Sequence, residues 1–273
     1  MGKKNVLVII LTVLVFLSAA TLGVSTVYRV DEVTVKTSVV SEAAKTEAEE
    51  LQRRLQETYQ KRSTFFADQA LADEVVASFP YFRITSFEKD YPNRLVFQVT
   101  EDGEMYAVPC TDGSEQYYIL NAEGLVLAVR SDPANRSDGG ANVILKGSGN
   151  TALTATGVRG ELLSGDDCLP TLFAFVNEIS VRLDGIRRNV VSVEVERPAS
   201  NAKETVFKLT MNTMKEGVKI YVRDPFSLTS EKAQRAIDEY LSLSDKKKLS
   251  GMIAVWDDTD GVNAGYYERD GLE

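Results

Sequence analysis

Residues 75–101 decide the fold of the first half of the chain, and they read VVASFPYFRITSFEKDYPNRLVFQVTE. Pro80 cannot continue a helix, so the apolar residues before it close a helical stripe. Apolar and polar residues alternate after Pro80, which predicts a strand that runs to about Lys89. The turn-forming residues at 90–93 connect that strand to a second one that passes through Val99. This stretch therefore predicts a helix followed by a β-hairpin.

The residues upstream add a strand and a longer helix to this hairpin. Alternating valines predict a half-buried strand within 28–36. Ser41 is a typical helix-capping residue, and Asp68 is a candidate cap for the helix that ends at Pro80. Between them an apolar stripe at helical spacing is made of Ala44, Ala48, Leu51, Leu55 and Tyr59. The predicted order is strand–helix–helix–strand–strand, with both helices on one face of a three-stranded sheet.

An uncharged, apolar segment lies near the N-terminus, directly after two lysines. About twenty apolar residues cross the roughly 30 Å hydrocarbon layer of a bilayer. We therefore expect a transmembrane helix at 5–27 in contact with the lipid bilayer, and the preceding lysines place residues 1–4 in the cytoplasm. A signal peptide cleaved near residues 18–20 is the competing interpretation. Both interpretations put Ser25 and all later residues outside the cytoplasm.

Composition excludes several classes of function. The chain has 273 residues, no histidine, two cysteines and a net charge of −9. Without histidine there is no Ser-His-Asp triad, no Cys-His pair and no histidine zinc site, and two cysteines cannot form a four-cysteine metal site. The acidic charge repels phosphate backbones, so we expect no nucleic-acid partner. Cys110 and Cys168 either form one disulfide or remain two thiols, and their spacing does not decide between these states.

Residues 102–268 predict a mixed β domain with flanking helices, followed by a short tail at 269–273. Period-two alternation and turn residues predict strands at 105–110, 117–120, 125–129, 143–145, 190–196, 206–211, 218–222, 252–256 and 264–268. Apolar stripes predict one helix that begins near Asp166 and a second helix over 229–243. The polar residues 130–142 predict a mobile loop.

Four motifs contain residue types that can bind ligands or catalyse reactions, and each has an ordinary structural interpretation. Gly147-Ser148-Gly149 lacks the other residues of a phosphate-binding loop, and Asp258-x-Asp260-Gly261 lacks the remaining ligands of a calcium loop. The adjacent carboxylates of Asp166 and Asp167 favour a helix cap over an acid–base pair, although glycosidases do use paired carboxylates. Lys246–Lys248 could contact anionic lipid or a wall polymer, but a solvated helix end is the simpler interpretation. We therefore predict a protein that is not an enzyme and holds no metal or cofactor.

Three blocks of sequence occur in an order that is informative as a set. The first is the stretch 75–101, the second is YYILNAEG at 117–124, and the third joins GVKIYV at 217–222 to GMIAV at 251–255 through a predicted helix. Together they resemble the FtsQ/DivIB family of bacterial cell-division proteins, over about residues 5–268. The first block is similar to the end of that family's POTRA domain, and the others are similar to parts of its β domain.

The resemblance implies a fold class and a domain plan. The fold is expected to be α+β, with an N-terminal transmembrane helix, a POTRA domain of βααββ order at 28–101 and a β domain at 102–268. The location implied is the cell membrane at the division septum, with a single span and both domains outside the cytoplasm.

The resemblance also implies a function, which is that of a divisome scaffold in the control of septal peptidoglycan synthesis. Its expected partners are small FtsL/DivIC-like and FtsB-like division proteins. Because the last predicted hairpin has no later strand to pair with, it is expected to form a sheet edge where a partner strand adds. The resemblance also places the family's partner-binding strand at this end. The expected partner-binding residues are Ile253, Val255, Trp256, Ala264, Tyr266 and Tyr267.

Two other classes of function remain open at this stage. An exported POTRA-type chaperone for polypeptide translocation would have several POTRA repeats or a cleaved leader. The sequence contains one POTRA-like pattern. An exported wall hydrolase would need a reactive group of side chains, which the sequence does not place.

Overall fold

The computed structural model describes residues 10–18, 23, 26–38, 41–138, 140–148, 153–197, 204–212 and 217–268. The chain divides into two compact units, and the division falls between Asp102 and Gly103, one residue beyond the predicted boundary. Both units combine helices with β-sheet, so the predicted α+β class holds.

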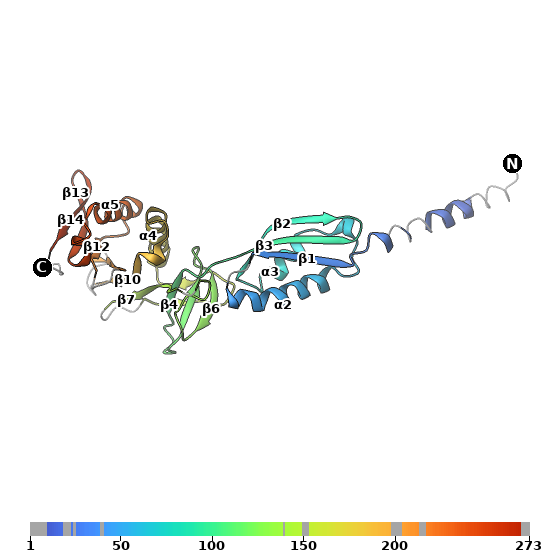
Figure 1. Ribbon diagram of the computed structural model, residues 1–273, viewed down its shortest axis with the longest axis horizontal. Helices are drawn as coiled ribbons and strands as arrows, with labels where there is room; N and C mark the ends of the chain where they lie inside the picture. The colour runs from blue at the N-terminus through green and yellow to red at the C-terminus, as the bar shows by residue number, and fades with distance from the viewer. Residues whose placement is uncertain are drawn as a thin grey trace. The chain divides into compact units, whose positions relative to one another are not determined.

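The first unit has the predicted order of strand, helix, helix, strand, strand (Figure 1). Its elements are β1 (Glu32–Ser38), α2 (Glu42–Tyr59), the 3₁₀ turn η1 (Thr64–Phe66), α3 (Ala70–Val76), β2 (Phe82–Asp90) and β3 (Arg94–Glu101). The sheet order is β1-β3-β2, with β1 parallel to β3 and β2 antiparallel to β3.

The helix α2 forms where the sequence places a cap and an apolar stripe. The Ser41 hydroxyl accepts a hydrogen bond from the backbone N–H of Ala44 at 3.0 Å, as the capping pattern predicts. Four residues of the stripe, Ala44, Leu51, Leu55 and Tyr59, are buried, and Ala48 is half-buried. At its centre the fully buried ring of Phe97 lies 5.5 Å from the ring of Tyr59 and 4.9 Å from the ring of Phe87. These aromatic pairs join α2 to the sheet.

The second unit is built on a sheet of nine strands among the described residues. The strands are β4 (Tyr106–Pro109), β5 (Tyr117–Leu120), β6 (Val126–Arg130), β7 (Val143–Gly147), β10 (Val190–Glu196), β11 (Val206–Met211), β12 (Lys219–Arg223), β13 (Met252–Asp258) and β14 (Gly261–Tyr267). Their order in the sheet is β14-β13-β12-β11-β10-β7-β4-β5-β6. The short pair β8 (Ala155–Thr156) and β9 (Ser164–Gly165) stands apart and was not predicted.

Two helices, α4 (Leu169–Arg182) and α5 (Thr229–Ser242), pack together against this sheet. Their apolar stripes meet the inward side chains of the strands, as in the edge-to-face contact between Phe175 and Phe207 at 5.4 Å. The opposite sheet face carries polar pairs, and Glu194 there accepts from Lys208 at 3.3 Å and from Lys146 at 3.1 Å. One face of the sheet is therefore the core, and the other face is partly solvated.

The polar segment at 130–142 is a loop, as predicted, and several of its residues form hydrogen bonds with a buried carboxylate. The side chain of Glu104 is fully buried and is held by both terminal nitrogens of Arg130, at 2.8 and 2.7 Å. The backbone N–H of Arg136 and the side chain of Asn142 also donate to it, at 2.8 and 3.3 Å. The amide of Asn135 bonds the backbone oxygen of Glu104 at 2.7 Å. Glu104 therefore organises a loop about thirty residues further along the chain.

The prediction of a transmembrane helix at 5–27, and of a single-pass membrane protein with it, was wrong. Within the described part of the chain, no helix combines the length and the apolar character needed to cross a membrane. The residues of this segment that the structure describes as helical are 10–18, 23, 26 and 27. The bilayer contact expected through 5–27 depended on that helix. Residues 1–4 and 269–273 lie outside the described residues.

Candidate functional site

The hairpin of β13 and β14 closes one end of the nine-stranded sheet, where the sequence predicted an edge (Figure 1). The two strands pair in regular antiparallel register from Met252 opposite Tyr267 to Asp258 opposite Gly261. Gly261 has a φ of 122°, a conformation that favours glycine, and it begins β14 after a tight turn. The acidic Asp258-x-Asp260 motif forms this turn. We call the outer backbone edge of β14 the open edge.

One face of this hairpin belongs to the core beneath α5. Ile253 and Val255 are fully buried there, and Ala264 and Tyr266 pack against the same core from β14. The side chains of Ile253 and Val255 therefore support the hairpin from within and are not presented at the surface. The backbone of β14 lies beside these two residues and forms the edge of the sheet.

The other face of the hairpin carries two aromatic rings beside a glycine. Trp256 is half-buried and Tyr267 is 48% exposed. A Cβ atom built on Gly265 would lie 3.5 Å from Cη2 of Trp256 and 3.7 Å from Cε2 of Tyr267. The rings therefore stand beside Gly265 on the sheet face away from the α5 core. Trp256 thus lies next to the open edge, as the partner-binding prediction requires.

Tyr266 is fixed at the far end of β14 by two contacts. Its hydroxyl donates to the backbone oxygen of Ser250 at 3.0 Å, and the ammonium of Lys247 lies 5.1 Å from its ring centroid. The ammonium of Lys248 lies 5.2 Å from the ring of Tyr240 on α5. Lysines at these distances from ring faces form cation–π contacts. Two of the three lysines at 246–248 therefore have a structural role.

The two edges of the nine-stranded sheet differ in what lies beside them. At one edge, the segment 159–163 lies along β6. The backbone N–H of Val126 donates to the oxygen of Glu161 at 2.9 Å, and the Arg159 side chain bonds the oxygen of Leu127 at 3.0 Å. Beyond β14 the described residues place no further strand. The sequence of β14, GVNAGYY, also lacks the lysine and proline that commonly block edge pairing. The open edge is therefore suited to accept another strand.

A buried lysine lies at the turn end of the same hairpin. Lys232 on α5 is fully buried, and its ammonium donates to the Asp257 carboxylate and the Ser227 hydroxyl, each at 2.8 Å. It also donates to the backbone oxygens of Arg223 and Asp224, at 3.1 and 2.6 Å. Lys232 therefore ties α5 and the loop after β12 to the last turn of the edge hairpin.

The contact between Ser227 and Lys232 is the geometry that a Ser–Lys hydrolase would use, and its surroundings oppose that chemistry. A lysine that activates a serine must give up its proton. Here the Lys232 side chain donates to the carboxylate of Asp257 and to two carbonyl oxygens as well as to Ser227. Burial alone would raise the pKa of Asp257, but hydrogen bonds from Lys232 and Ser227 outweigh it and hold that pKa below its usual value. The cluster is thus an ion pair that holds structure.

Sequence reasoning did not find Lys232 as a buried residue, although a signal was present. Lys232 precedes Ala236 by four residues and Tyr240 by eight, so it lies on the apolar stripe of α5. A lysine within such a stripe is buried only where several acceptors surround it.

The carboxylates of Asp166 and Asp167 are used at the start of α4. Asp166 accepts from the backbone N–H of Cys168 at 3.0 Å and from Arg197 at 2.6 Å, and Asp167 is ion-paired with the same Arg197 at 2.9 Å. Burial opposes ionisation of Asp166, yet these hydrogen bonds lower its pKa. One arginine thus bridges both carboxylates, which is a structural arrangement and not an acid–base pair.

The two cysteines are separate thiols. Cys168 is fully buried, and burial together with the nearby charge of Asp166 raises its pKa to about 12. Cys110 is half-buried, and burial raises its pKa as well. Raised pKa values keep both sulfurs protonated, which is the unreactive form.

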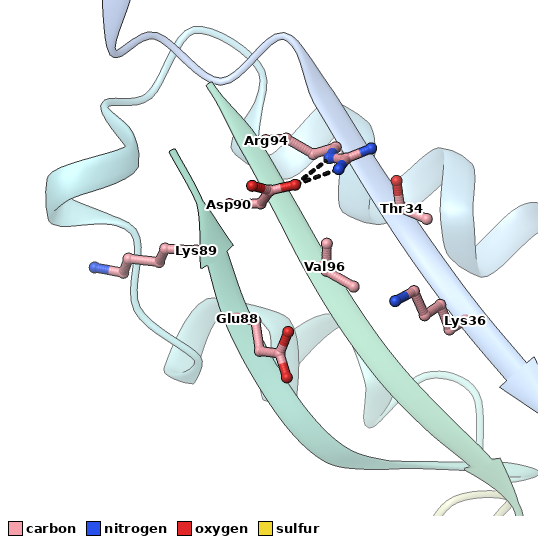
Figure 2. Close-up of a pocket in the computed structure, with 7 residues that line it drawn as sticks. All are labelled: Thr34, Lys36, Glu88, Lys89, Asp90, Arg94 and Val96. Atoms are coloured by element: carbon pink, nitrogen blue, oxygen red, sulfur yellow. Dashed lines mark hydrogen bonds and ion pairs between the residues drawn. The ribbon is translucent and has the colours of Figure 1, made fainter. Parts of the chain in front are cut away.

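A shallow pocket lies on the sheet of the first unit, and its lining is charged (Figure 2). Arg94 donates through Nε to the Asp90 carboxylate at 2.8 Å. Lys36 on β1 and Glu88 on β2 reach over the sheet on opposite sides of Val96. Charged side chains of both signs alternate here. The arrangement is that of a solvated sheet face.

Within the residues that the structure describes, no group of three or more acidic or cysteine side chains could hold a metal ion. The open edge with its neighbouring rings is therefore the strongest candidate site. No protein-family model matches the chain, and no curated protein matches it at a significant level.

Proposed function

We propose that the protein is a non-enzymatic scaffold that binds an extended segment of a partner protein along the open edge of β14. The observation that carries this proposal is the contrast between the two edges of one sheet. The β6 edge is covered by residues 159–163, whereas the described residues add no strand to β14. An edge strand offers unpaired backbone N–H and C=O groups that a partner strand completes.

Aromatic side chains beside the edge support the same proposal. Tryptophan and tyrosine are enriched among the residues that dominate the energy of protein interfaces. Trp256 on β13 and Tyr267 on β14 are both partly exposed, and the hydroxyl of Tyr266 fixes the end of β14 by its bond to Ser250. A partner strand at the open edge would cover these rings and bury their apolar surface.

The sequence blocks that resemble the FtsQ/DivIB family suggest the biological setting. In this proposal the first unit is a POTRA domain, and its βααββ order supports that assignment. The partners are FtsL/DivIC-like and FtsB-like division proteins, and the complex acts outside the cytoplasm in the control of septal peptidoglycan synthesis. A fluorescent fusion imaged in dividing cells tests the setting. Enrichment at midcell supports it, and an even distribution contradicts it.

The binding surface is tested by capture of the FtsB-like protein of the same organism on the immobilised full chain. Tyr267→Ala should weaken binding by about 2 kcal/mol, which is about thirtyfold, if the ring is a central anchor. Tyr91→Ala is the matched control, because Tyr91 is 51% exposed and Tyr267 is 48% exposed. A chain that ends after Asp260 lacks β14 and should not bind. Equal capture by all of these variants, each shown to be folded, would move the surface elsewhere.

A further inference from the structure

The open edge presents the backbone groups of alternate residues of β14. The backbone oxygen of Tyr267 points toward β13, because it lies 2.5 Å from the position that a Cβ on Gly251 would take. In an antiparallel ladder, hydrogen-bonded and non-hydrogen-bonded pairs alternate along the strand. The residues that direct their N–H and C=O groups away from β13 are therefore Val262, Ala264 and Tyr266. These groups are the ones that another strand can bind.

These outward-directed residues are symmetric about Ala264, so β14 can pair with a copy of itself. A two-fold axis at Ala264 places that residue opposite Ala264 of the second copy, and Val262 opposite Tyr266 of the second copy. Each of these pairs is a hydrogen-bonded pair of an antiparallel ladder. Val262 with Tyr266 is also a β-branched–aromatic pair, a type that stabilises sheets. The register uses all seven residues of β14 and the same surface on both copies, as in two-fold dimers.

The remaining side chains of β14 suit the same register. Tyr267 lies opposite Gly261 of the second copy, and Asn263 lies opposite Gly265. The larger side chain of each pair therefore faces a glycine, so two bulky groups do not compete for one place. The strand reads GVNAGYY and contains no charged residue. Like charges, which destabilise a pair of strands when they lie opposite each other, thus do not meet within the ladder.

The charges that do meet lie just beyond the two ends of the ladder. The next position pairs Asp260 with Glu268 of the second copy, and both residues are exposed and acidic. Their repulsion limits the ladder to β14. Salt screens exposed charges, so pairing in this register should become stronger as the ionic strength rises.

We infer that the open edge binds a second copy of this chain, with β14 antiparallel to β14 about a two-fold axis at Ala264. The two nine-stranded sheets then become one continuous sheet. One strand from each copy is little surface beside the roughly 1,200–2,000 Å² that stable complexes bury, so we expect a weak and reversible dimer. The inference goes beyond the proposed function and needs no other protein. It adds that the second copy and the partner segment compete for the same edge.

Disulfide trapping tests the register in the full chain. Asn263 and Gly265 of the second copy form a non-hydrogen-bonded pair, whose Cα atoms lie about 4.5 Å apart, within the range of about 4.4–6.8 Å that a disulfide spans. A mixture of Asn263→Cys and Gly265→Cys should therefore form a linked dimer under mild oxidation. Either variant alone should give at least fivefold less, because two cysteines at the same position lie diagonally, about 7–8 Å apart.

Two controls make the trapping specific. Asn263→Cys mixed with Thr259→Cys is the matched control, because Thr259 is exposed in the turn of the same hairpin and lies outside the register. It should give no more dimer than the single variants. The wild-type chain gives the background from Cys110 and Cys168. The variant-free measurement is sedimentation equilibrium of the wild-type chain, whose average mass should rise with concentration and rise further at high ionic strength.

The inference is overturned if the matched mixture yields no more dimer than the Thr259→Cys control, even where the chain self-associates. It is also overturned if the wild-type chain stays monomeric at every concentration, and this measurement decides if a cysteine variant does not fold. The proposed function is judged separately. If the linked dimer captures the FtsB-like protein as well as the same mixture does after reduction, the dimer stands and the proposed use of the open edge fails. If no linked dimer forms while Tyr267→Ala loses capture, the proposed function stands and this inference fails.

Discussion

Arg130→Met tests the buried pair that orders the loop after β6. The substitution removes both bonds to the Glu104 carboxylate, at 2.8 and 2.7 Å, and leaves that group fully buried with its charge. Removing one partner of a buried ion pair commonly costs 3–5 kcal/mol. Because the donors on Arg136 and Asn142 remain, we expect a loss near the lower end, about 3 kcal/mol. That is a large part of the 5–15 kcal/mol that stabilises a typical domain.

The assay is urea unfolding followed by tryptophan fluorescence. The only tryptophan of the chain, Trp256, lies in the same unit as the pair, so its signal reports on the right part of the molecule. The midpoint should fall while the slope with urea stays constant. The double substitution Glu104→Gln with Arg130→Met removes both charges, keeps a side-chain oxygen as acceptor for Arg136 and Asn142, and should recover much of the loss. A single Arg130→Met within about 1 kcal/mol of the wild type would refute the argument, as would a double variant less stable than the single one.

Three further predictions concern other parts of the molecule. Phe97→Asp places an unpaired charge in the centre of the first unit. A fragment of residues 26–102 that carries this substitution should therefore show no cooperative thermal unfolding by circular dichroism. A melting temperature equal to that of the wild-type fragment would contradict this. In the native protein at pH 8, iodoacetamide should modify Cys110 before Cys168, because Cys168 is fully buried and its pKa is raised to about 12; equal rates in the native state would contradict this. Because its contacts with Lys232 lower the pKa of Asp257, the stability that its charge contributes is present above the ordinary value of 3.8 and is lost as the pH falls below it. The stability difference between wild type and Asp257→Asn should therefore shrink from pH 7 to pH 3 in urea titrations, and a constant difference would contradict this.

Regular elements were predictable because their signals are local. The cap at Ser41 and the stripe through Leu51 and Leu55 specify α2, and alternation specifies strands such as β10 and β11. The hairpin of β13 and β14 was predictable for a similar reason, since apolar alternation on both sides of a short acidic turn is a local signal.

The remaining features depend on contacts between distant residues. Glu104 and Arg130 are 26 positions apart, and nothing near either of them indicates that they meet. Likewise, the acceptors around Lys232 come from the loop after β12 and from β13. The aromatic surroundings of Gly265 depend on the register between two strands. The prediction at 5–27 relied on apolar composition, which does not establish the length of a helix.

The position of β14 as the last of the nine strands in chain order has a consequence for biosynthesis. The strand that forms the open edge leaves the ribosome after every other strand of its sheet. A chain interrupted before Gly261 would expose the edge of β13, whose sequence MIAVWDD begins with five apolar residues. Such an edge favours aggregation and recognition by quality-control proteases. Only chains translated beyond β14 would then cover the edge of β13.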